Sequence, residues 1–371
     1  MDDRVRKLAR ADLDQIAPYV PGKPMQEVQR ELGLEAVIKM ASNENPLGPS
    51  PKVRAAIRGA VREVSRYPEG SAYYLKKELS RTLRVPEEAL VVGSGSSEVI
   101  FLFLQTFVSP GEEIVFPHPS FLIYKILAHT IGARPVTAPL NDDFSYRMEH
   151  LLSAVTQRTK AVILCNPNNP TGTFVSRAQI AWFIQRLPEN VLLLSDEAYA
   201  EYAESPDFGT ALPYLGRGTV LVARTFSKIY ALAGLRIGYG ITSPEIAALM
   251  EKIRPPFNTT GIAQVAAVAA LQDAAHVRRS YETNLRGKRY LCAAFARLGV
   301  PFVRSEANFI LCDLGPDAPL IVRELELRGI LVRPVGAFGL PPQYVRVTIG
   351  TMRENRAFVS ALTELLAGRR R

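Results

Sequence analysis

A lysine that follows an apolar run is the first residue of this sequence that could do chemistry. Residues 220–223 are β-branched and apolar, as expected of a buried strand in a parallel sheet, and Thr225, Ser227 and Lys228 follow directly. Ammonium groups avoid the interior unless they are paired or reactive. A partly buried lysine is the group that forms a Schiff base with an aldehyde cofactor. An ordinary surface lysine explains this stretch equally well by itself. The residues at the ends of the other expected strands must therefore distinguish the two interpretations.

A second expected strand ends in a possible phosphate site. The sequence Gly95-Ser96-Ser97 follows a strand at 89–92 and opens an apolar helix at 96–108. Glycine lets the backbone approach an anion, and the free N–H groups at a helix start favour negative charge. A tight turn between strand and helix would have the same sequence.

Polar side chains also follow two further apolar runs. Asn169 lies in the loop N-P-N-N-P-T-G after residues 160–165, and Asp196 and Tyr199 follow residues 191–195. A carboxylate at the end of a buried strand is costly unless a cation pairs with it, although Asp196 could also cap a helix. Together with the lysine, these groups meet the needs of pyridoxal 5′-phosphate: its aldehyde, phosphate, ring nitrogen and phenolic oxygen.

The elements that must position these residues alternate between apolar runs and helical segments. This rhythm predicts an α/β fold with a mostly parallel, doubly wound sheet of about seven strands. The expected strands are residues 89–92, 113–116, 134–138, 160–165, 191–195, 219–223 and 237–241. Beyond them we expect a largely helical stretch at 244–297 and a smaller α+β unit with strands at 308–312, 330–333 and 344–349.

Length and composition limit the classes of protein that this chain can belong to. With 371 residues, 47% of them hydrophobic, we expect a globular protein of about two domains. The net charge of +9 suits anionic ligands, but the basic residues are dispersed, which argues against nucleic-acid binding. We expect no membrane span and no metal site. Because three scattered cysteines form no disulfide framework, we expect a cytoplasmic location.

The complete set of motifs resembles the fold-type I pyridoxal-phosphate aminotransferases, and within them the histidinol-phosphate branch. The resemblance covers essentially the whole chain. It rests on Ala17-Pro18-Tyr19, Ser42-Asn43-Glu44-Asn45-Pro46, Arg66-Tyr67-Pro68, Asn168-Asn169-Pro170-Thr171-Gly172, Asp196-Glu197-Ala198-Tyr199, Ser227-Lys228 and Val345-Arg346-Val347-Thr348-Ile349-Gly350. It implies a large cofactor-binding domain at 45–265 and a small domain at 266–371 joined by the arm at 1–44.

The resemblance also implies a role for each site residue. Lys228 would hold the cofactor covalently and move the Cα proton, Asp196 would pair with the ring nitrogen, and Asn169 and Tyr199 would bind the phenolic oxygen. Phe121 would stack on the ring, where the branch often has Tyr. The residues expected to hold the phosphate are Gly95, Ser96, Ser97, Thr225, Ser227 and Arg236, with Tyr67 reaching it from the neighbouring subunit of a homodimer.

The implied substrates are small anionic molecules. Strict alternation along residues 344–348 puts Tyr344, Arg346 and Thr348 on one face of a strand. The resemblance assigns Arg333, Arg346, Asn43 and Tyr19 to substrate binding, and histidinol phosphate, glutamate and 2-oxoglutarate as substrates. An aromatic amino-acid aminotransferase and a threonine-phosphate decarboxylase remain open alternatives, and Arg346 could also form an ordinary surface ion pair. A non-catalytic pyridoxal-phosphate sensor is disfavoured because no DNA-binding module precedes Ala17.

Overall fold

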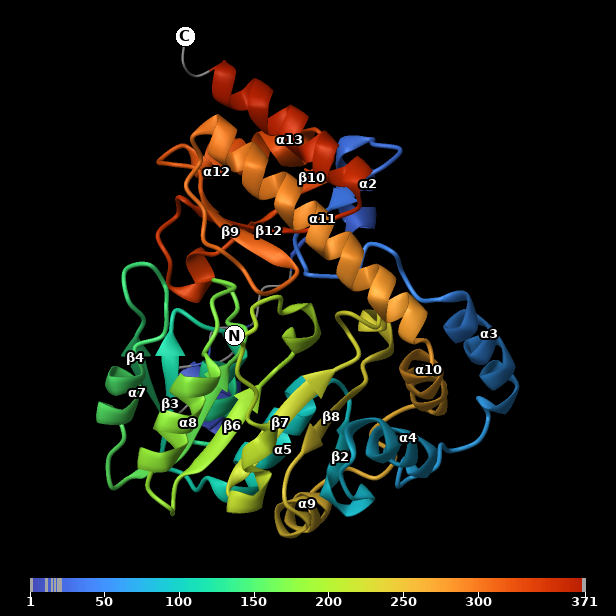
Figure 1. Cartoon of the computed structure of the whole chain (residues 1–371), viewed down its shortest axis with the longest axis vertical. Helices are drawn as coiled ribbons and strands as arrows, with labels where there is room; N and C mark the ends of the chain where they lie inside the picture. The colour runs from blue at the N-terminus through green and yellow to red at the C-terminus, as the bar shows by residue number, and fades with distance from the viewer. Residues whose placement is uncertain (1–2, 11–12, 15, 17, 19–21, 369–371) are drawn as a thin grey trace.

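A seven-stranded sheet forms the centre of the larger unit. The computed structural model describes residues 3–10, 13–14, 16, 18 and 22–368, and the strand order is β2-β8-β7-β6-β5-β3-β4 (Figure 1). The strands are β2 (Leu90–Gly93), β3 (Glu113–His118), β4 (Arg134–Pro139), β5 (Thr159–Cys165), β6 (Leu192–Asp196), β7 (Val220–Thr225) and β8 (Gly238–Ile241). Only β8 runs antiparallel to its neighbours within this sheet. The mostly parallel α/β sheet is therefore confirmed, and each of the seven strands expected in it forms.

Helices cover both faces of this sheet. They are α3 (Pro51–Ala60), α4 (Tyr73–Leu83), α5 (Ser96–Phe107), α6 (Ile123–Thr130), α7 (Met148–Ser153), α8 (Arg177–Arg186), α9 (Pro244–Glu251) and α10 (Gly261–Leu271). Side chains alternate along β5, so that Ile163 packs with α5, α6 and α9 whereas Leu164 packs with the core formed by α3, α4, α7, α8 and α10. Both faces of the inner strands are buried, which explains their nearly continuous apolar sequences.

The smaller unit combines two short sheets with three helices. β9 (Phe309–Asp313), β11 (Arg333–Pro334) and β12 (Tyr344–Thr348) form an antiparallel sheet, and β1 (Ile38–Lys39) pairs with β10 (Ile330–Leu331). α12 (Ala318–Leu327) and α13 (Met352–Ala367) cover a separate apolar core with α11 (Ala274–Leu298), which extends from the larger unit into the smaller one (Figure 1). At the N-terminal end lie α1 (Asp3–Leu8) and α2 (Met25–Leu32). The domain division at residues 44/45 and 265/266 stays a proposal, and its second boundary lies within α10, whose alanines pack in the core of the larger unit.

One expected element of the smaller unit is wrong. The single strand expected at 330–333 is divided, because residues 330–331 pair with β1 whereas residues 333–334 pair with β12. Pro334 lacks an N–H group and lies in the edge strand β11, where proline is tolerated. The division brings Arg333 opposite Arg346 in the register of β11 and β12.

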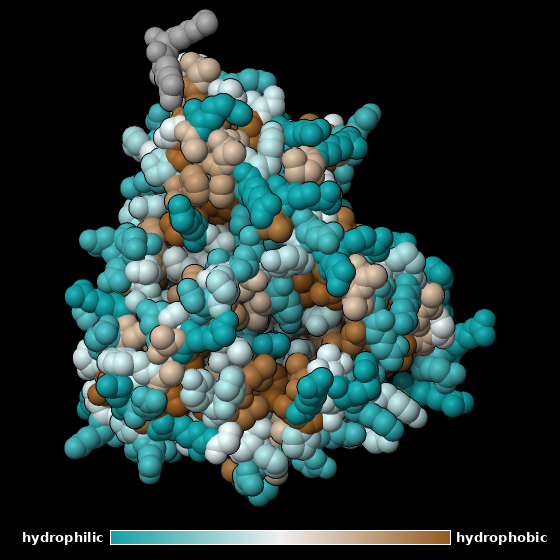
Figure 2. All heavy atoms as spheres, in the orientation of Figure 1, coloured by the Kyte–Doolittle hydropathy of each residue, from teal (hydrophilic) through white to brown (hydrophobic). Residues whose placement is uncertain are grey.

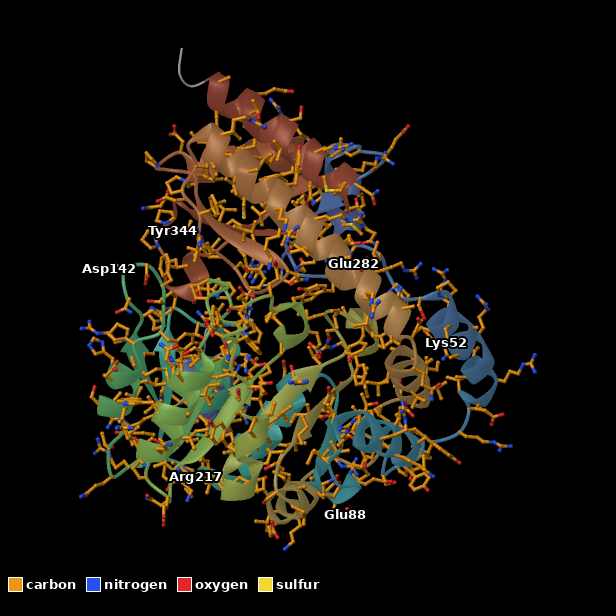
Figure 3. The ribbon with its side chains drawn as sticks, viewed as in Figure 1. Lys52, Glu88, Asp142, Arg217, Glu282 and Tyr344 are labelled. Carbon is orange, nitrogen blue, oxygen red and sulfur yellow. The ribbon has the colours of Figure 1, made fainter. Side chains whose placement is uncertain are left out.

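The two units pack against each other through polar and aromatic contacts. Glu306 accepts a hydrogen bond from the Ser205 N–H group at 3.0 Å, and the Lys288 Nζ atom lies 2.8 Å from Glu204. On the opposite side, the rings of Phe144 and Tyr344 meet edge to face with centroids 5.5 Å apart. Figure 3 shows Tyr344 on the smaller unit near the loop of Asp142 on the larger unit. These contacts fix the geometry of any site that lies between the units.

Hydrophilic residues cover most of the face shown in Figure 2, and hydrophobic residues appear there as separate patches. Among residues 3–10, 13–14, 16, 18 and 22–368, no helix is both long and apolar enough to span a bilayer. Within the same described ranges, no group of three or more His, Cys, Asp or Glu side chains could hold a metal ion.

Candidate active site

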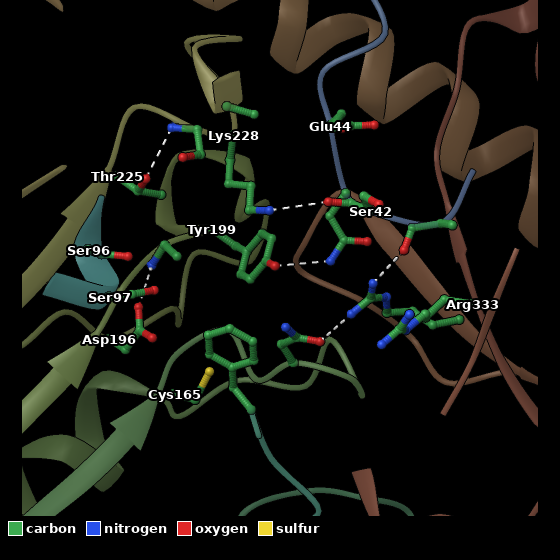
Figure 4. Close-up of a pocket in the computed structure, with 18 of the residues that line it drawn as sticks. Ser42, Glu44, Ser96, Ser97, Cys165, Asp196, Tyr199, Thr225, Lys228 and Arg333 are labelled. Atoms are coloured by element: carbon green, nitrogen blue, oxygen red, sulfur yellow. Dashed lines mark hydrogen bonds between the residues drawn. The ribbon is translucent and has the colours of Figure 1, made fainter. Parts of the chain in front are cut away.

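Residues from both units line a cavity of about 270 Å³ beyond the carboxyl ends of β5, β6 and β7 (Figure 4). Most of the residues that the sequence predicts for the site line this cavity: Asn43, Ser96, Ser97, Phe121, Asn169, Asp196, Tyr199, Thr225, Ser227, Lys228, Arg236, Arg333 and Arg346. Gly95 adjoins Arg236 at the edge of the site. The predicted residue Tyr19 lies outside the described residues. Ligand sites in open α/β sheets lie at this edge, beyond the strand ends.

Tyr67 is the one described site residue that the structure places away from this cavity. Its side chain is 82% exposed, and its ring stacks on Phe257 with centroids 4.7 Å apart. A single chain therefore does not bring Tyr67 to the site, and its expected role requires a second subunit.

Lys228 follows β7 and extends into the cavity. Its Nζ atom lies 3.4 Å from the Ser42 carbonyl oxygen and 5.4 Å from the centre of the Tyr199 ring. Burial, and then the charge of Arg346, lower the pKa of Lys228 to about 8. At pH 7 a lysine with a pKa of about 8 is neutral about one tenth of the time, far more than an ordinary lysine, so it can act as a nucleophile or as a base.

Asp196 ends β6 on the floor of the cavity and is only 3% exposed. Its Oδ2 atom accepts a hydrogen bond from the Tyr124 hydroxyl at 2.7 Å, and Oδ1 accepts one from the Ala198 N–H group at 3.3 Å. Burial raises the pKa of Asp196 to about 6, and these hydrogen bonds limit the rise. A buried carboxylate with few donors stabilises a cation placed beside it.

A cluster of hydroxyl groups and one guanidinium occupies the end of the cavity near α5. The Arg236 Nη1 atom donates to the Ser227 hydroxyl at 3.2 Å, and Ser96 begins α5. Gly95 has φ 79°, and a side chain there would collide with Arg236. Hydroxyls, a guanidinium and a helix start are the donors that a phosphate group requires.

Gly238 in β8 makes this close packing possible, because it has no side chain between β8 and the turn that precedes α5. A Cβ atom at this position would lie 2.4 Å from the Ser96 nitrogen and 2.6 Å from the Gly95 carbonyl carbon. The turn that precedes α5 therefore rests directly on the backbone of β8. Because β8 lies between β2 and β7, it brings Ser96 and Ser227 to one end of one cavity.

Arg346 connects the smaller unit to the loop after β5. Its Nη1 atom donates to Asn169 Oδ1 at 2.6 Å, and its Nη2 atom donates to the Ala41 carbonyl oxygen at 2.7 Å. The guanidinium also lies over the rings of Phe309 and Phe338. Arg346 is buried, so the alternative of an ordinary surface ion pair is wrong. Arg333 in β11 and Arg346 in β12 lie opposite each other in the sheet, and both thus line the same cavity.

Asn43 connects the smaller unit to Tyr199. Its Nδ2 group donates to the Tyr199 hydroxyl oxygen at 3.0 Å, while its backbone N–H and its Oδ1 atom both bond to the Thr348 hydroxyl. Asn43 has φ 57°, a left-handed conformation that asparagine tolerates better than most residues. Burial raises the pKa of Tyr199, so this phenol keeps its proton and can donate it in a hydrogen bond.

Sequence reasoning missed the partners that hold these residues in place. Glu197 is buried and accepts hydrogen bonds from Thr210 and from Arg224, whose Nη2 atom lies 2.8 Å away, and the ion pair joins the ends of β6 and β7. Tyr124 was also missed, although its position in the apolar helix after Phe121 could have indicated a buried partner for Asp196.

The donor set of the cavity fits a phosphorylated aromatic aldehyde with a basic ring nitrogen. The hydroxyl and guanidinium cluster suits the phosphate, Asp196 suits a protonated ring nitrogen, and Lys228 suits the aldehyde carbon. Phe121 offers an aromatic ring beside the same space. This combination defines a class of cofactor rather than a single substrate.

The chain belongs to the aminotransferase class I and II family, whose model matches residues 35–362. It is 46% identical over 354 residues to a histidinol-phosphate aminotransferase of Moorella thermoacetica, which covers 95% of this chain and 91% of the relative. A second histidinol-phosphate aminotransferase, from Symbiobacterium thermophilum, is 44% identical over 96% of this chain and 98% of the relative.

Solved structures agree with this assignment. Histidinol-phosphate aminotransferase from Sinorhizobium meliloti, crystallised in complex with pyridoxal-5′-phosphate, matches with a TM-score of 0.88 and 30% identity. The match covers 97% of this chain and 98% of that chain. The fold is therefore the fold-type I aminotransferase fold that the sequence motifs predicted.

Proposed function

We propose that this protein is a pyridoxal-phosphate-dependent aminotransferase of histidine biosynthesis. It transfers the amino group of L-histidinol phosphate to 2-oxoglutarate, giving imidazole acetol phosphate and L-glutamate, in a reversible reaction. The observation that carries the proposal is the pair Arg333 and Arg346 in the same cavity as Lys228 and Asp196. The site thus combines groups for the cofactor with two guanidiniums for an anionic substrate.

The residues of the cavity divide into those that would hold the cofactor and Lys228, which would also move the proton at the substrate Cα. Gly95, Ser96, Ser97, Thr225, Ser227 and Arg236 would hold the phosphate, and Asn169 and Tyr199 would bind the phenolic oxygen. When bound, pyridoxal phosphate withdraws the electrons that remain at the substrate Cα after its proton leaves. Lys228 would hold the cofactor at its aldehyde carbon and would move the proton at the substrate Cα, since its pKa of about 8 suits both acceptance and return of a proton.

The test of the substrate is a half-reaction followed by absorbance. Cofactor-loaded protein is mixed separately with L-histidinol phosphate and with L-phenylalanine, and the conversion of bound pyridoxal phosphate to pyridoxamine phosphate is recorded. We expect fast conversion with histidinol phosphate and slow conversion with phenylalanine. The reverse order would identify an aromatic amino-acid aminotransferase, and no conversion with either would favour a decarboxylase or a sensor.

Replacing Arg333 should separate the two half-reactions. We expect Arg333→Ala to lower kcat/KM for histidinol phosphate by roughly 10–100-fold, because one charged hydrogen bond to phosphate contributes about 1.5–3 kcal/mol. The half-reaction with glutamate should change less, because Arg346 remains to bind the α-carboxylate. Arg328→Ala, which removes an arginine that pairs with Glu364 on the surface, is the matched control. Equal losses in both half-reactions would contradict this division of roles.

We also propose that the protein works as a homodimer. Large apolar side chains are exposed on two segments that lie together, 61–74 and 249–265, as the Tyr67–Phe257 stack and the packing of α10 on α3 and α4 require. Val64 is 69% exposed and Tyr74 is 71% exposed, which is unusual for an isolated surface. Tyr67 then reaches the cofactor phosphate of the neighbouring subunit.

Charging this surface should dissociate the dimer. We expect the double variant Val64→Asp/Tyr74→Asp to elute as a monomer and to bind the cofactor more weakly, because two buried carboxylates would oppose association. Light scattering coupled to size-exclusion chromatography measures the mass. Leu320→Asp, at a 56% exposed position of α12 on the smaller unit, is the control and should leave the mass unchanged. A wild-type protein that is monomeric at micromolar concentration would refute the proposal.

We place the protein in the cytoplasm. Cys165, Cys292 and Cys312 are all free thiols. Proteins of oxidising compartments usually pair their cysteines, so three free thiols support a reducing compartment.

A further inference from the structure

Tyr124 contacts two of the residues that face the proposed cofactor ring. It lies in the first turn of α6 with a fully buried side chain, and its hydroxyl donates to Asp196 Oδ2 at 2.7 Å. Its ring packs edge to face against Phe121, with centroids 5.8 Å apart and planes at 86°. One side chain therefore supports both the carboxylate and the aromatic ring that line the cavity.

This hydrogen bond matters because Asp196 has few other donors. The Ala198 N–H group is the second donor, at the longer distance of 3.3 Å. The titratable groups around Asp196 are Tyr124 from α6, Glu197 beside it in sequence, Lys228 after β7 and Cys165 at the end of β5, together with the more weakly interacting phenols of Tyr146 and Tyr199. Of these, Tyr124 is the one that donates directly to the carboxylate.

The phenol is suited to remain the donor. Burial and the neighbouring carboxylate raise the pKa of Tyr124 well above its ordinary value, so the proton stays on the tyrosine oxygen. With Oδ2 bonded in this way, the rotation of the carboxyl group is restricted, and its remaining lone pairs stay available on the cavity side.

We propose that Tyr124 is a positioning residue that fixes the Asp196 carboxylate for its bond to the ring nitrogen of the cofactor. The inference rests on the proposed function, since it requires pyridoxal phosphate in the cavity. Tyr124 does not line the cavity, so it would touch neither the substrate nor the cofactor. It acts through Asp196, and its packing against Phe121 keeps the stacking ring at a constant distance from the same carboxylate.

The test compares two ligands that differ at one atom. Apoprotein is titrated with pyridoxal phosphate and with an analogue in which a C–H group replaces the ring nitrogen, and dissociation constants are measured by fluorescence. We expect Tyr124→Phe to weaken the binding of pyridoxal phosphate about tenfold, as loss of a hydrogen bond to a charged group implies. Binding of the analogue should change less than about twofold, because it makes no bond to Asp196.

Two further variants keep the inference falsifiable. Tyr146→Phe removes another buried tyrosine hydroxyl, which bonds to the Cys165 carbonyl oxygen. This variant should not weaken the binding of one ligand more than the binding of the other. In an Asp196→Asn background, Tyr124→Phe should have little further effect on pyridoxal phosphate binding, since the charged acceptor is gone.

The outcomes separate this inference from the proposed function. Equal weakening of both ligands by Tyr124→Phe, or no weakening of pyridoxal phosphate, would overturn the role of Tyr124 alone. Failure of the wild-type protein to attach pyridoxal phosphate at Lys228, measured by borohydride reduction and mass spectrometry, would instead overturn the proposed function and the inference with it.

Discussion

The variant Lys228→Ala should lose turnover by at least about 10⁴-fold, because it removes the group that we propose both attaches the cofactor and carries the proton. The half-reaction measured by stopped-flow absorbance gives the rate. Borohydride reduction followed by mass spectrometry should label position 228 in the wild-type protein and not in the variant. The rate of cofactor attachment to wild-type apoprotein should rise with pH through about 8, where the Lys228 amine becomes neutral.

A lysine-to-arginine control tests whether charge alone explains the loss. Lys228→Arg keeps a cation in the cavity but supplies no nucleophile, because the guanidinium stays protonated. It should therefore be as inactive as Lys228→Ala. Substantial transamination by either variant would exclude Lys228 as the catalytic residue.

Replacing Asp196 should produce the second largest loss. Asp196→Asn keeps the shape and an acceptor for Tyr124 but removes the charge that, in our proposal, keeps the ring nitrogen protonated. We expect the rate of the half-reaction to fall by about 10²–10³-fold, in the range seen when one preorganised electrostatic partner is removed. Single-turnover absorbance measurements isolate this step. A variant with a near wild-type rate would show that the ring nitrogen does not depend on this carboxylate.

The same substitution should have the opposite effect on the stability of the apoprotein. The pKa of Asp196 is about 6 in the fold and near 4 in an unfolded chain, so its stabilising contribution is complete below about pH 4 and is lost as the pH rises through 6. Asp196→Asn should therefore raise the free energy of unfolding above pH 6, by on the order of 1–3 kcal/mol. Denaturant unfolding at pH 4 and pH 8 measures the difference, which should vanish at the lower pH.

The central sheet and its strand ends could be predicted because they depend on local sequence. Continuous apolar runs between helical segments identify buried parallel strands, and the residues after each run must meet at one edge of the sheet. Lys228, Asp196 and Asn169 were found in this way, and they line one cavity. The division of the strand expected at 330–333 could not be predicted, because it depends on which distant segment pairs with each half.

The supporting contacts escaped prediction for a related reason. Tyr124 and Asp196 are 72 residues apart in sequence, and Asn43 and Thr348 are 305 apart, so no spacing rule connects either pair. Tyr67 is a different case, because its expected partner belongs to a second subunit. Sequence patterns therefore indicate which residues carry the chemistry, whereas tertiary packing decides which residues hold them in place.

The contact of Gly238 with the turn before α5 limits how this protein can evolve. A mutation there introduces a side chain against backbone atoms, which cannot move aside as a flexible side chain can. The turn would have to lift away from β8, and Ser96 would leave Ser227 and Arg236. A library of substitutions selected for growth should consequently accept few changes at Gly238, although this position does not line the cavity. Positions that tolerate no substitution would therefore include residues in the layer beneath the cofactor site.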